Sequence, residues 1–265
     1  MEQKEQIDDE SLEKVSKILD ILVGTIQNFS ILLKPLTKAS PNTIVSWGLV
    51  PNDRELTPRA ACDRKLLNDN DAIFVGNTQN KSVFFTFDLG SESGYTDHIL
   101  DILKGNNIKA IFFLCGGYLK EKQLIDRMIA EGHVIGNHTD KHKDLPTVSN
   151  EEMRKDIVTF QKNFQKIYPY YVIKLFRPPF GRFDQRTLKI AKVKGLRTIL
   201  WSSAIVDWGE TPTEIESNVD KIITRLHPGA ILLLHICNSS APGLLKELLF
   251  RIAEKTYQVG NPSEL

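Results

Sequence analysis

Acidic, basic and imidazole side chains stand directly after several short apolar runs of the chain. Asp88 follows Val-Phe-Phe-Thr-Phe, Arg177 follows Leu-Phe, and His235 follows Ala-Ile-Leu-Leu-Leu. A carboxylate can take a proton from water and an imidazole can give one to a leaving amine, so these residue types could carry out hydrolysis by acid–base catalysis. Asp207, after Ala-Ile-Val, could orient either the imidazole or the guanidinium. Each residue also has a structural interpretation, as a strand-end cap, a salt bridge or a buried hydrogen-bonding group.

His138 and His142 lie four residues apart in a chain that has six histidines. On a helical turn this spacing places both imidazoles on one side, an arrangement that suits a divalent metal ion. A metal ion there would polarise a carbonyl oxygen and lower the pKa of water. Asp88 would then be either a further ligand or the base that takes the proton of the water.

Short apolar runs alternate with helical patterns from Lys81 to the end of the chain. This alternation predicts a parallel sheet covered by helices, and the number of units favours a closed or nearly closed barrel. The reactive residues would meet at the face formed by the carboxyl ends of the strands. The expected strands are Ser82–Phe87, Lys109–Cys115, His133–Gly136, Leu175–Arg177, Arg197–Ser202 and Ala230–His235. The expected helices are Tyr95–Lys104, Leu119–Glu131, Glu151–Tyr168, Asp184–Lys194, Thr213–Leu226 and Gly243–Tyr257.

The residues before Lys81 show two other patterns. Apolar residues recur every three or four positions from Ser11 to Leu33, which predicts one amphipathic helix that packs on the following domain or binds a partner or a membrane surface. Residues 35–80 are rich in turn formers and are expected to form an irregular, extended lead-in. We therefore expect an N-terminal helical extension, residues 1–45, and a catalytic domain, residues 46–265.

The composition excludes several classes of function and partner. Lysine and arginine number 34 against 33 acidic residues, which gives a net charge of +1 and argues against nucleic acid or an anionic membrane as the main partner. Three separated cysteines exclude a disulfide framework. Cys115 and Cys237 lie next to strand ends and could reach the site, but they are interpreted as inert buried thiols. Neither a transmembrane segment nor a signal peptide is predicted, because charged residues interrupt the apolar stretch Leu12–Leu33 and the first ten residues are acidic.

Five ordered motifs resemble those of a known enzyme family. Thr-Phe-Asp-x-Gly, His-x-x-x-His, Arg-Pro-Pro-Phe-Gly, Val-Asp-Trp and Leu-Leu-His occur here in the order found in the polysaccharide deacetylase superfamily, the family 4 carbohydrate esterases. Residues 86–96, 131–138, 201–208 and 227–231 resemble the muramic-acid deacetylase branch of spore formers. The resemblance implies a distorted (β/α) barrel of about seven parallel strands. It also implies an extracytoplasmic or cell-wall-associated enzyme that removes N-acetyl groups from N-acetylmuramic acid in peptidoglycan glycan strands, leading to the muramic δ-lactam of spore cortex.

The resemblance also implies a role for each matching residue. Asp88 is expected to be the general base, held in its working state by Arg177, and His235 the general acid, tuned by Asp207. The family's cofactor is a divalent metal ion, with zinc expected, and the ligands that match here are His138 and His142. The expected substrate contacts are Trp208 and Leu233 around the acetyl group and Phe180 beside the sugar. A backbone N–H after Arg177 is expected to help stabilise the oxyanion.

Leu89 departs from the family pattern. The superfamily has its third metal ligand directly after the base, usually Asp, with Asn in the muramic-acid branch, and leucine cannot bind a metal ion. Two histidines with water or Asp88 could hold the ion, or Glu92 or Asp140 could substitute. Alternatively, the protein is a metal-free pseudoenzyme or a glycan-binding scaffold. A further alternative keeps the catalysis but changes the substrate to another N-acetylated glycan, such as chitin-like oligomers.

Overall fold

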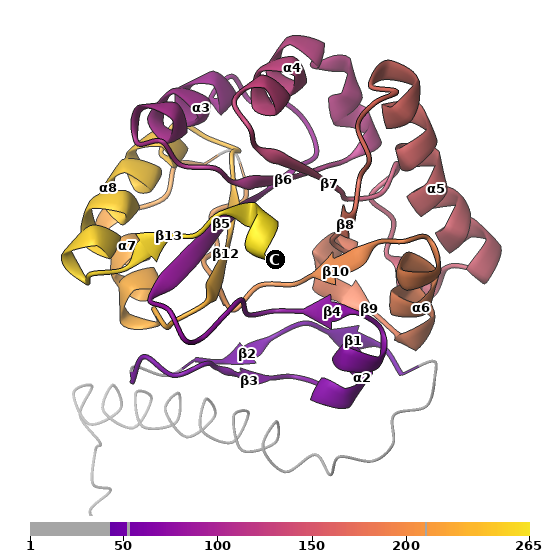
Figure 1. Cartoon of the computed structure of the whole chain (residues 1–265), viewed down its shortest axis with the longest axis horizontal. Coiled ribbons are helices and arrows are strands. Elements are labelled where there is room, and N and C mark those ends of the chain that lie inside the picture. The colour runs from indigo at the N-terminus through magenta and orange to yellow at the C-terminus, as the bar shows by residue number, and fades with distance from the viewer. Residues whose placement is uncertain (1–42, 52–53, 210) are drawn as a thin grey trace, which may run out of the picture. The chain divides into compact units, whose positions relative to one another are not determined.

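The computed structural model describes residues 43–51, 54–209 and 211–265 (Figure 1). The helix expected from Ser11 to Leu33 lies outside the described residues, so this helix and the boundary at residue 45 stay predictions. None of the helices in the described residues is both long enough and apolar enough to span a membrane.

A curled sheet of mostly parallel strands forms the centre of the structure. Its strands follow the order β11-β12-β5-β6-β7-β8-β10-β4, and all these neighbours pair in parallel. The short strand β13 also pairs with β5. The predicted distorted (β/α) barrel is confirmed. The strands are β4 (Ala72–Ile73), β5 (Ser82–Leu89), β6 (Ile111–Leu114), β7 (Val134–Asn137), β8 (Leu175–Phe176), β10 (Arg197–Ile199), β11 (Ser203–Ala204), β12 (Ala230–His235) and β13 (Gln258–Val259).

Strand β5 is buried along its whole length, with its two faces in different surroundings. Phe84 packs inside the barrel against residues of β6, β10 and β12. Phe85, Phe87 and Leu89 belong to the core between the sheet and the helices. Because successive side chains of a strand point to opposite faces, Thr86 and Asp88 lie on the interior side with Phe84. A strand buried on both faces reads as a continuous apolar run, as this one does.

In the described part of the chain, six helices surround the sheet, each following a strand (Figure 1). They bury one apolar side against the sheet. Local capping fixes where several of them begin: the Ser149 side chain accepts from the N–H of Glu152 at the start of α5, and the Asp184 side chain accepts from the N–H of Thr187 at the start of α6. The helices are α3 (Thr96–Gly105), α4 (Lys122–Ala130), α5 (Asn150–Ile167), α6 (Gln185–Val193), α7 (Ile215–Thr224) and α8 (Ala241–Glu254). These bounds confirm the helices expected from the sequence to within a few residues.

The expectation of an irregular lead-in is wrong for much of its described part. Strand β4 joins the parallel sheet beside β10, and an isolated bridge from Val75 to Ala230 ties this edge to β12. The other lead-in elements are β1 (Val45–Ser46), β2 (Leu49–Val50), β3 (Arg59–Ala60) and the helix α2 (Arg64–Asp69), and β1 pairs with β9 (Arg182–Phe183). Strands of two residues are too short to show alternation, and the partners of β1 and β4 lie far along the chain, so the sequence pattern could not reveal them.

Candidate active site

Asp88 and Arg177 form a buried ion pair at the carboxyl ends of β5 and β8. Arg177 Nη1 donates to Asp88 Oδ1 at 2.8 Å and to Thr86 Oγ1 at 2.8 Å, and Nε donates to the carbonyl of Ile199 at 2.9 Å. The guanidinium also lies 4.2 Å from the centre of the Phe113 ring. Burial by itself would raise the pKa of Asp88, but the charge and hydrogen bond of Arg177 outweigh it and leave the pKa lowered. Asp88 is therefore ionised at neutral pH.

His138 lies next to this pair and has a fixed tautomer. Its Nδ1 is 2.8 Å from the carbonyl oxygen of Arg177, and because a carbonyl only accepts, Nδ1 carries the proton and Nε2 keeps its lone pair. Nε2 lies 3.5 Å from Asp88 Oδ2. Burial lowers the pKa of the imidazole. A neutral imidazole with one nitrogen held by a carbonyl is the usual state of a histidine metal ligand.

His142 approaches His138 through a loop. The ring centroids lie 4.9 Å apart, but the segment between the two residues is not helical. Thr139 and His142 have φ values of 69° and 51°, and the loop is held by the bond from His142 N to Thr139 Oγ1 at 3.0 Å. The helical turn expected from the four-residue spacing is therefore wrong, although the two imidazoles do meet. Burial lowers the pKa of His142 to about 4.

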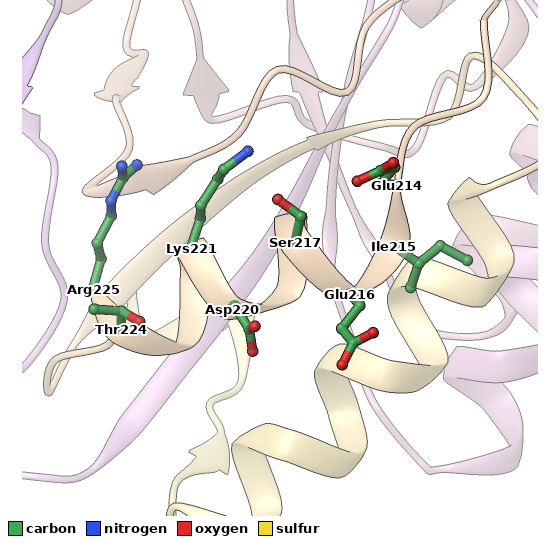
Figure 2. A pocket seen from close by; sticks show the side chains of 8 residues that line it. All are labelled: Glu214, Ile215, Glu216, Ser217, Asp220, Lys221, Thr224 and Arg225. Atoms are coloured by element: carbon green, nitrogen blue, oxygen red, sulfur yellow. The ribbon is translucent and has the colours of Figure 1, made fainter. Parts of the chain in front are cut away.

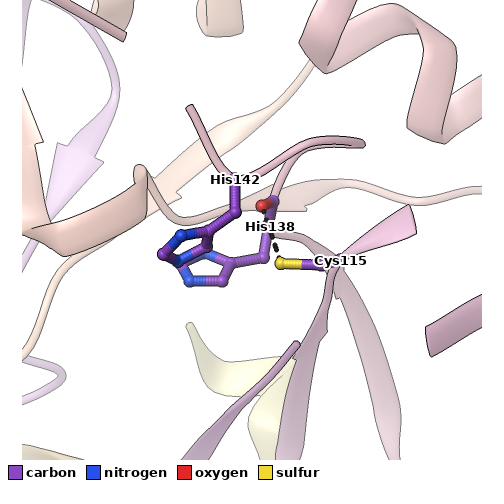
Figure 3. Close-up of side chains that lie close together, drawn as sticks. All are labelled: Cys115, His138 and His142. Atoms are coloured by element: carbon purple, nitrogen blue, oxygen red, sulfur yellow. Dashed lines mark hydrogen bonds between the residues drawn. The ribbon is translucent and has the colours of Figure 1, made fainter. Parts of the chain in front are cut away.

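Cys115, which the sequence predicts to be an inert buried thiol, lies beside the two histidines (Figure 3). Its Sγ donates to the carbonyl oxygen of His138 at 3.3 Å. The potential ligand atoms of Cys115, His138 and His142 all lie within 4.8 Å of one another, and these three residues are the group found among the described residues that could hold a metal ion. Burial raises the pKa of the thiol.

The two acidic residues proposed as substitute ligands are engaged elsewhere. Glu92 accepts hydrogen bonds from Gly94 N, Thr96 Oγ1 and Tyr118 Oη, each at 2.6 Å. Asp140 accepts from Asn163 at 3.3 Å and pairs with Lys141 at 3.4 Å. Neither residue belongs to the group that could hold a metal ion.

His235 and Asp207 form a second pair on the neighbouring strand. His235 lies opposite Asp88 in the register of β12 and β5. Its Nδ1 lies 2.8 Å from Asp207 Oδ1, and its backbone N–H donates to Asp207 Oδ2 at 2.8 Å, so Asp207 orients His235 and not Arg177. Burial would lower the pKa of the imidazole, but the hydrogen bond and charge of Asp207 raise it overall.

Three apolar residues, Phe180, Trp208 and Leu233, are predicted to contact the substrate. Phe180 is 60% exposed and packs edge-on against His142 at 4.5 Å between ring centroids. Trp208 is 65% exposed, whereas Leu233, between Ile231 and His235 on β12, is buried. Phe180 and Gly181 both have a left-handed backbone, with φ values of 59° and 62°. This conformation is strained for Phe180 but not for glycine, and a Cβ at Gly181 would lie 2.5 Å from the Trp201 ring.

A surface hollow along α7 lies apart from these residues (Figure 2). It is lined by Glu214, Ile215, Glu216, Ser217, Asp220, Lys221, Thr224 and Arg225. None of the predicted site residues lines it. The candidate site is therefore defined by the convergence of side chains at the strand ends.

Comparison with known proteins shows the family to which the chain belongs. The family model for polysaccharide deacetylases matches residues 75–199. The chain is 34% identical over 223 residues to the peptidoglycan-N-acetylmuramic acid deacetylase PdaA of Bacillus subtilis, covering 83% of this chain and 85% of that protein. The chain belongs to the polysaccharide deacetylase family. The family and the enzyme class expected from the motifs are thereby confirmed.

Two solved structures of this family resemble the fold. The structure of Bacillus subtilis PdaA, a family 4 carbohydrate esterase, has a TM-score of 0.79 and 33% identity, covering 85% of this chain and 98% of that chain. A family 4 pseudoenzyme from Bacillus anthracis has a TM-score of 0.67 and 29% identity, covering 73% of this chain and 68% of that one. The family thus includes a protein described as a pseudoenzyme.

Proposed function

We propose that this protein is a metal-dependent hydrolase that removes the N-acetyl group from N-acetylmuramic acid in peptidoglycan. The observation that carries the proposal is the pairing of Asp88 with Arg177 and of His235 with Asp207 on adjacent strands. The first pair supplies a base and the second an acid, next to the neutral imidazoles of His138 and His142. The substrate is proposed from the similarity to PdaA.

Asp88 is suited to accept a proton from the attacking water. Arg177 keeps the carboxylate ionised and occupies its Oδ1, which leaves Oδ2 toward His138. A divalent ion held by the imidazoles supplies the Lewis acidity that makes the water easier to deprotonate and the acetyl carbonyl more electrophilic. Because Pro178 and Pro179 have no N–H, the first backbone donor after Arg177 is that of Phe180, which we assign to the developing oxyanion.

His235 is suited to protonate the departing amine. Asp207 holds Nδ1 and raises the pKa of the ring, so that Nε2 carries a donatable proton near neutral pH. Water oxygen bonds to the acetyl carbon, the C–N bond breaks, acetate leaves and the sugar nitrogen takes the proton from His235. The freed amine can then condense with the lactyl carboxyl group, with loss of one water molecule, to form the muramic δ-lactam. We accordingly propose that the enzyme acts outside the cytoplasm, at the cell wall and in spore cortex.

The test is mass spectrometry of peptidoglycan fragments, freed of stem peptides, after incubation with the protein and added divalent metal ions. We expect muramic residues to lose an acetyl mass. Asp88→Asn and His235→Ala variants should lose most of this activity, by about 10²- to 10⁴-fold. Fully active Asp88→Asn and His235→Ala variants would overturn the assigned roles.

The second candidate function is a metal-free pseudoenzyme that binds glycan. Leu89 favours it, because a leucine stands beside the base and its side chain is buried in the core. Elemental analysis of the purified protein separates the two candidates. A stoichiometric divalent metal ion excludes the pseudoenzyme, and a metal-free protein that still binds glycan supports it.

A further inference from the structure

We propose that Cys115 is the third protein ligand of the metal ion, completing a site of two imidazoles and one thiolate. This inference rests on the metal dependence proposed above but not on the identity of the sugar. Two histidines alone are an incomplete set, because zinc sites in proteins have three or four protein ligands. Among the described residues, the sulfur of Cys115 is the donor grouped with both imidazoles.

The strand geometry directs Cys115 toward the imidazoles and Leu89 away from them. On β6, Phe112 and Leu114 pack in the core between the sheet and the helices, whereas Ile111 and Phe113 pack inside the barrel. Cys115 continues β6 with an extended backbone, so its side chain returns to the interior side. Leu89 is paired with Leu114 in the register and shares its outward side.

Main-chain bonds on both sides fix the position of Cys115. Its N–H donates to the carbonyl of Leu89 at 3.0 Å, and the next N–H, of Gly116, donates to the carbonyl of Thr139 at 3.1 Å. Thr139 lies between the two histidines in sequence. Cys115 therefore links the strand that carries Asp88 to the loop that carries both imidazoles, and the loop cannot move far from the sulfur without breaking these bonds.

The distances fit a metal site after a small adjustment. In a tetrahedral zinc site, with bonds of about 2.3 Å to sulfur and about 2.0–2.1 Å to nitrogen, ligand atoms lie about 3.3–3.6 Å apart. The three donors here lie within 4.8 Å of one another, so they need to close by at most about 1.2–1.5 Å. The sulfur can move by rotation of its side chain, which gives up a weak S–H bond to the His138 carbonyl.

Binding exchanges one proton for the metal ion. The Sγ–H bond breaks, the proton goes to the solvent, and the thiolate electron pair bonds to the ion. His138 binds through Nε2, because its Nδ1–H stays on the carbonyl of Arg177. A donor set of two imidazoles and one thiolate favours zinc or cobalt over magnesium, calcium or manganese, which prefer oxygen ligands.

The test is cobalt and zinc binding to the full chain, measured without substrate. Co²⁺ bound through a thiolate shows a sulfur-to-cobalt charge-transfer band that nitrogen and oxygen ligands do not give. We expect this band in the wild type and in the matched control Cys62→Ser, and its loss in Cys115→Ser and Cys115→Ala. Zinc affinity should fall in both Cys115 variants by more than the roughly 10- to 100-fold that loss of an outer-sphere partner costs.

The outcomes separate this inference from the proposed function. A wild type that binds Co²⁺ without the charge-transfer band, or Cys115 variants that bind zinc as tightly as the wild type, would overturn the role of Cys115 even if the protein deacetylates glycan. A wild type with the band but no deacetylase activity would support Cys115 and contradict the proposed function. A wild type that binds neither ion would overturn the inference and support the pseudoenzyme. Circular dichroism of each variant verifies that it is folded.

Discussion

At the scale of single residues, the site is built from charges that fix one another. Arg177 is fully buried, and its guanidinium binds the carboxylate of Asp88, the hydroxyl of Thr86 and a carbonyl of β10. Asp207 holds His235 in place with both carboxylate oxygens, one bound to the ring Nδ1 and the other to the backbone N–H. One pair lowers the pKa of a carboxyl group and the other raises the pKa of an imidazole, which are opposite shifts suited to a base and an acid.

Removing the charge of Arg177 should shift the acidic side of the pH–rate profile. In an Arg177→Met variant, burial raises the pKa of Asp88 and the main cation that opposes this effect is gone, so the carboxyl becomes ionised only at higher pH. We expect the acidic limb of kcat/KM to move to higher pH, and the free energy of unfolding to fall by about 3–5 kcal/mol at neutral pH. The control is Arg186→Met, which breaks a pair with Asp184 instead. An unshifted acidic limb would contradict the role of Arg177.

Asp207→Asn should shift the basic side of the pH–rate profile. The amide removes the negative charge that raises the pKa of His235, so the imidazole loses its proton at lower pH. The basic limb of kcat/KM is then expected to move to lower pH, with a rate loss of about 10²- to 10⁴-fold at neutral pH. Asp220→Asn, an exposed acid that pairs with Arg251, is the control. If the basic limb of Asp207→Asn coincides with that of the wild type, His235 is not tuned by Asp207.

Only some of the site residues could be predicted from the sequence pattern. Asp88, Arg177 and His235 end apolar runs, so their convergence followed from the fold class. The sequence did not predict that the side chain of Cys115 points into the barrel. The preceding strand, Ile111–Leu114, is apolar on both faces, so no alternation shows which residues face the interior. The loop between His138 and His142 was missed because a four-residue spacing also fits a helical turn.

At the scale of elements, the alternation of side chains between the two faces of a strand decides which residues reach the site. Leu89 and Leu114 face the helices, while Asp88 and Phe113 lie on the interior side. The sequence predicted the six strands from β5 to β12 that have clear apolar runs. It missed β4 and β1, because their pairing with β10 and β9 comes from contacts distant in the chain.

Leu89→Asp should destabilise the protein without improving metal binding. The position lies in the core between sheet and helices and is 2% exposed, so the carboxylate would lose solvation and leave a packing defect. We expect the free energy of unfolding to fall by at least about 2–5 kcal/mol, with no gain in zinc affinity. Val172→Asp, at a 69% exposed residue, should change stability little. A Leu89→Asp protein of normal stability with tighter zinc binding would contradict the placement of Leu89 on the side of the helices and the role of Cys115.

Trp47→Ala should show that the lead-in is part of the domain. Trp47 packs against Phe74 and Phe183, and its indole N–H donates to the carbonyl of Trp201 at 2.9 Å. Its backbone N–H also donates to Gly181, which follows Phe180 in the site. The variant is expected to lose about 3–5 kcal/mol of the free energy of unfolding in denaturant titration. Wild-type stability in Trp47→Ala would show that the lead-in is dispensable.

At the scale of the whole molecule, the described fold is a barrel whose strand ends carry one site. The similarity to PdaA covers 98% of that solved chain, so the likeness extends over the barrel and not over the motifs alone. The charge balance of 34 basic to 33 acidic residues is compatible with a glycan that needs no basic surface for binding. Both observations are compatible with the glycan substrate proposed above.

The most direct measurement is the position of acetyl loss in a defined glycan. Oligosaccharides of alternating N-acetylglucosamine and N-acetylmuramic acid, without stem peptides, are incubated with the zinc-loaded protein and sequenced by tandem mass spectrometry, with Asp88→Asn as the control. Our account predicts that acetyl groups are lost from the muramic residues alone, followed by loss of water as the δ-lactam forms, and that the control leaves the glycan intact. An intact glycan with the wild-type protein, or acetyl loss confined to glucosamine residues, would contradict it.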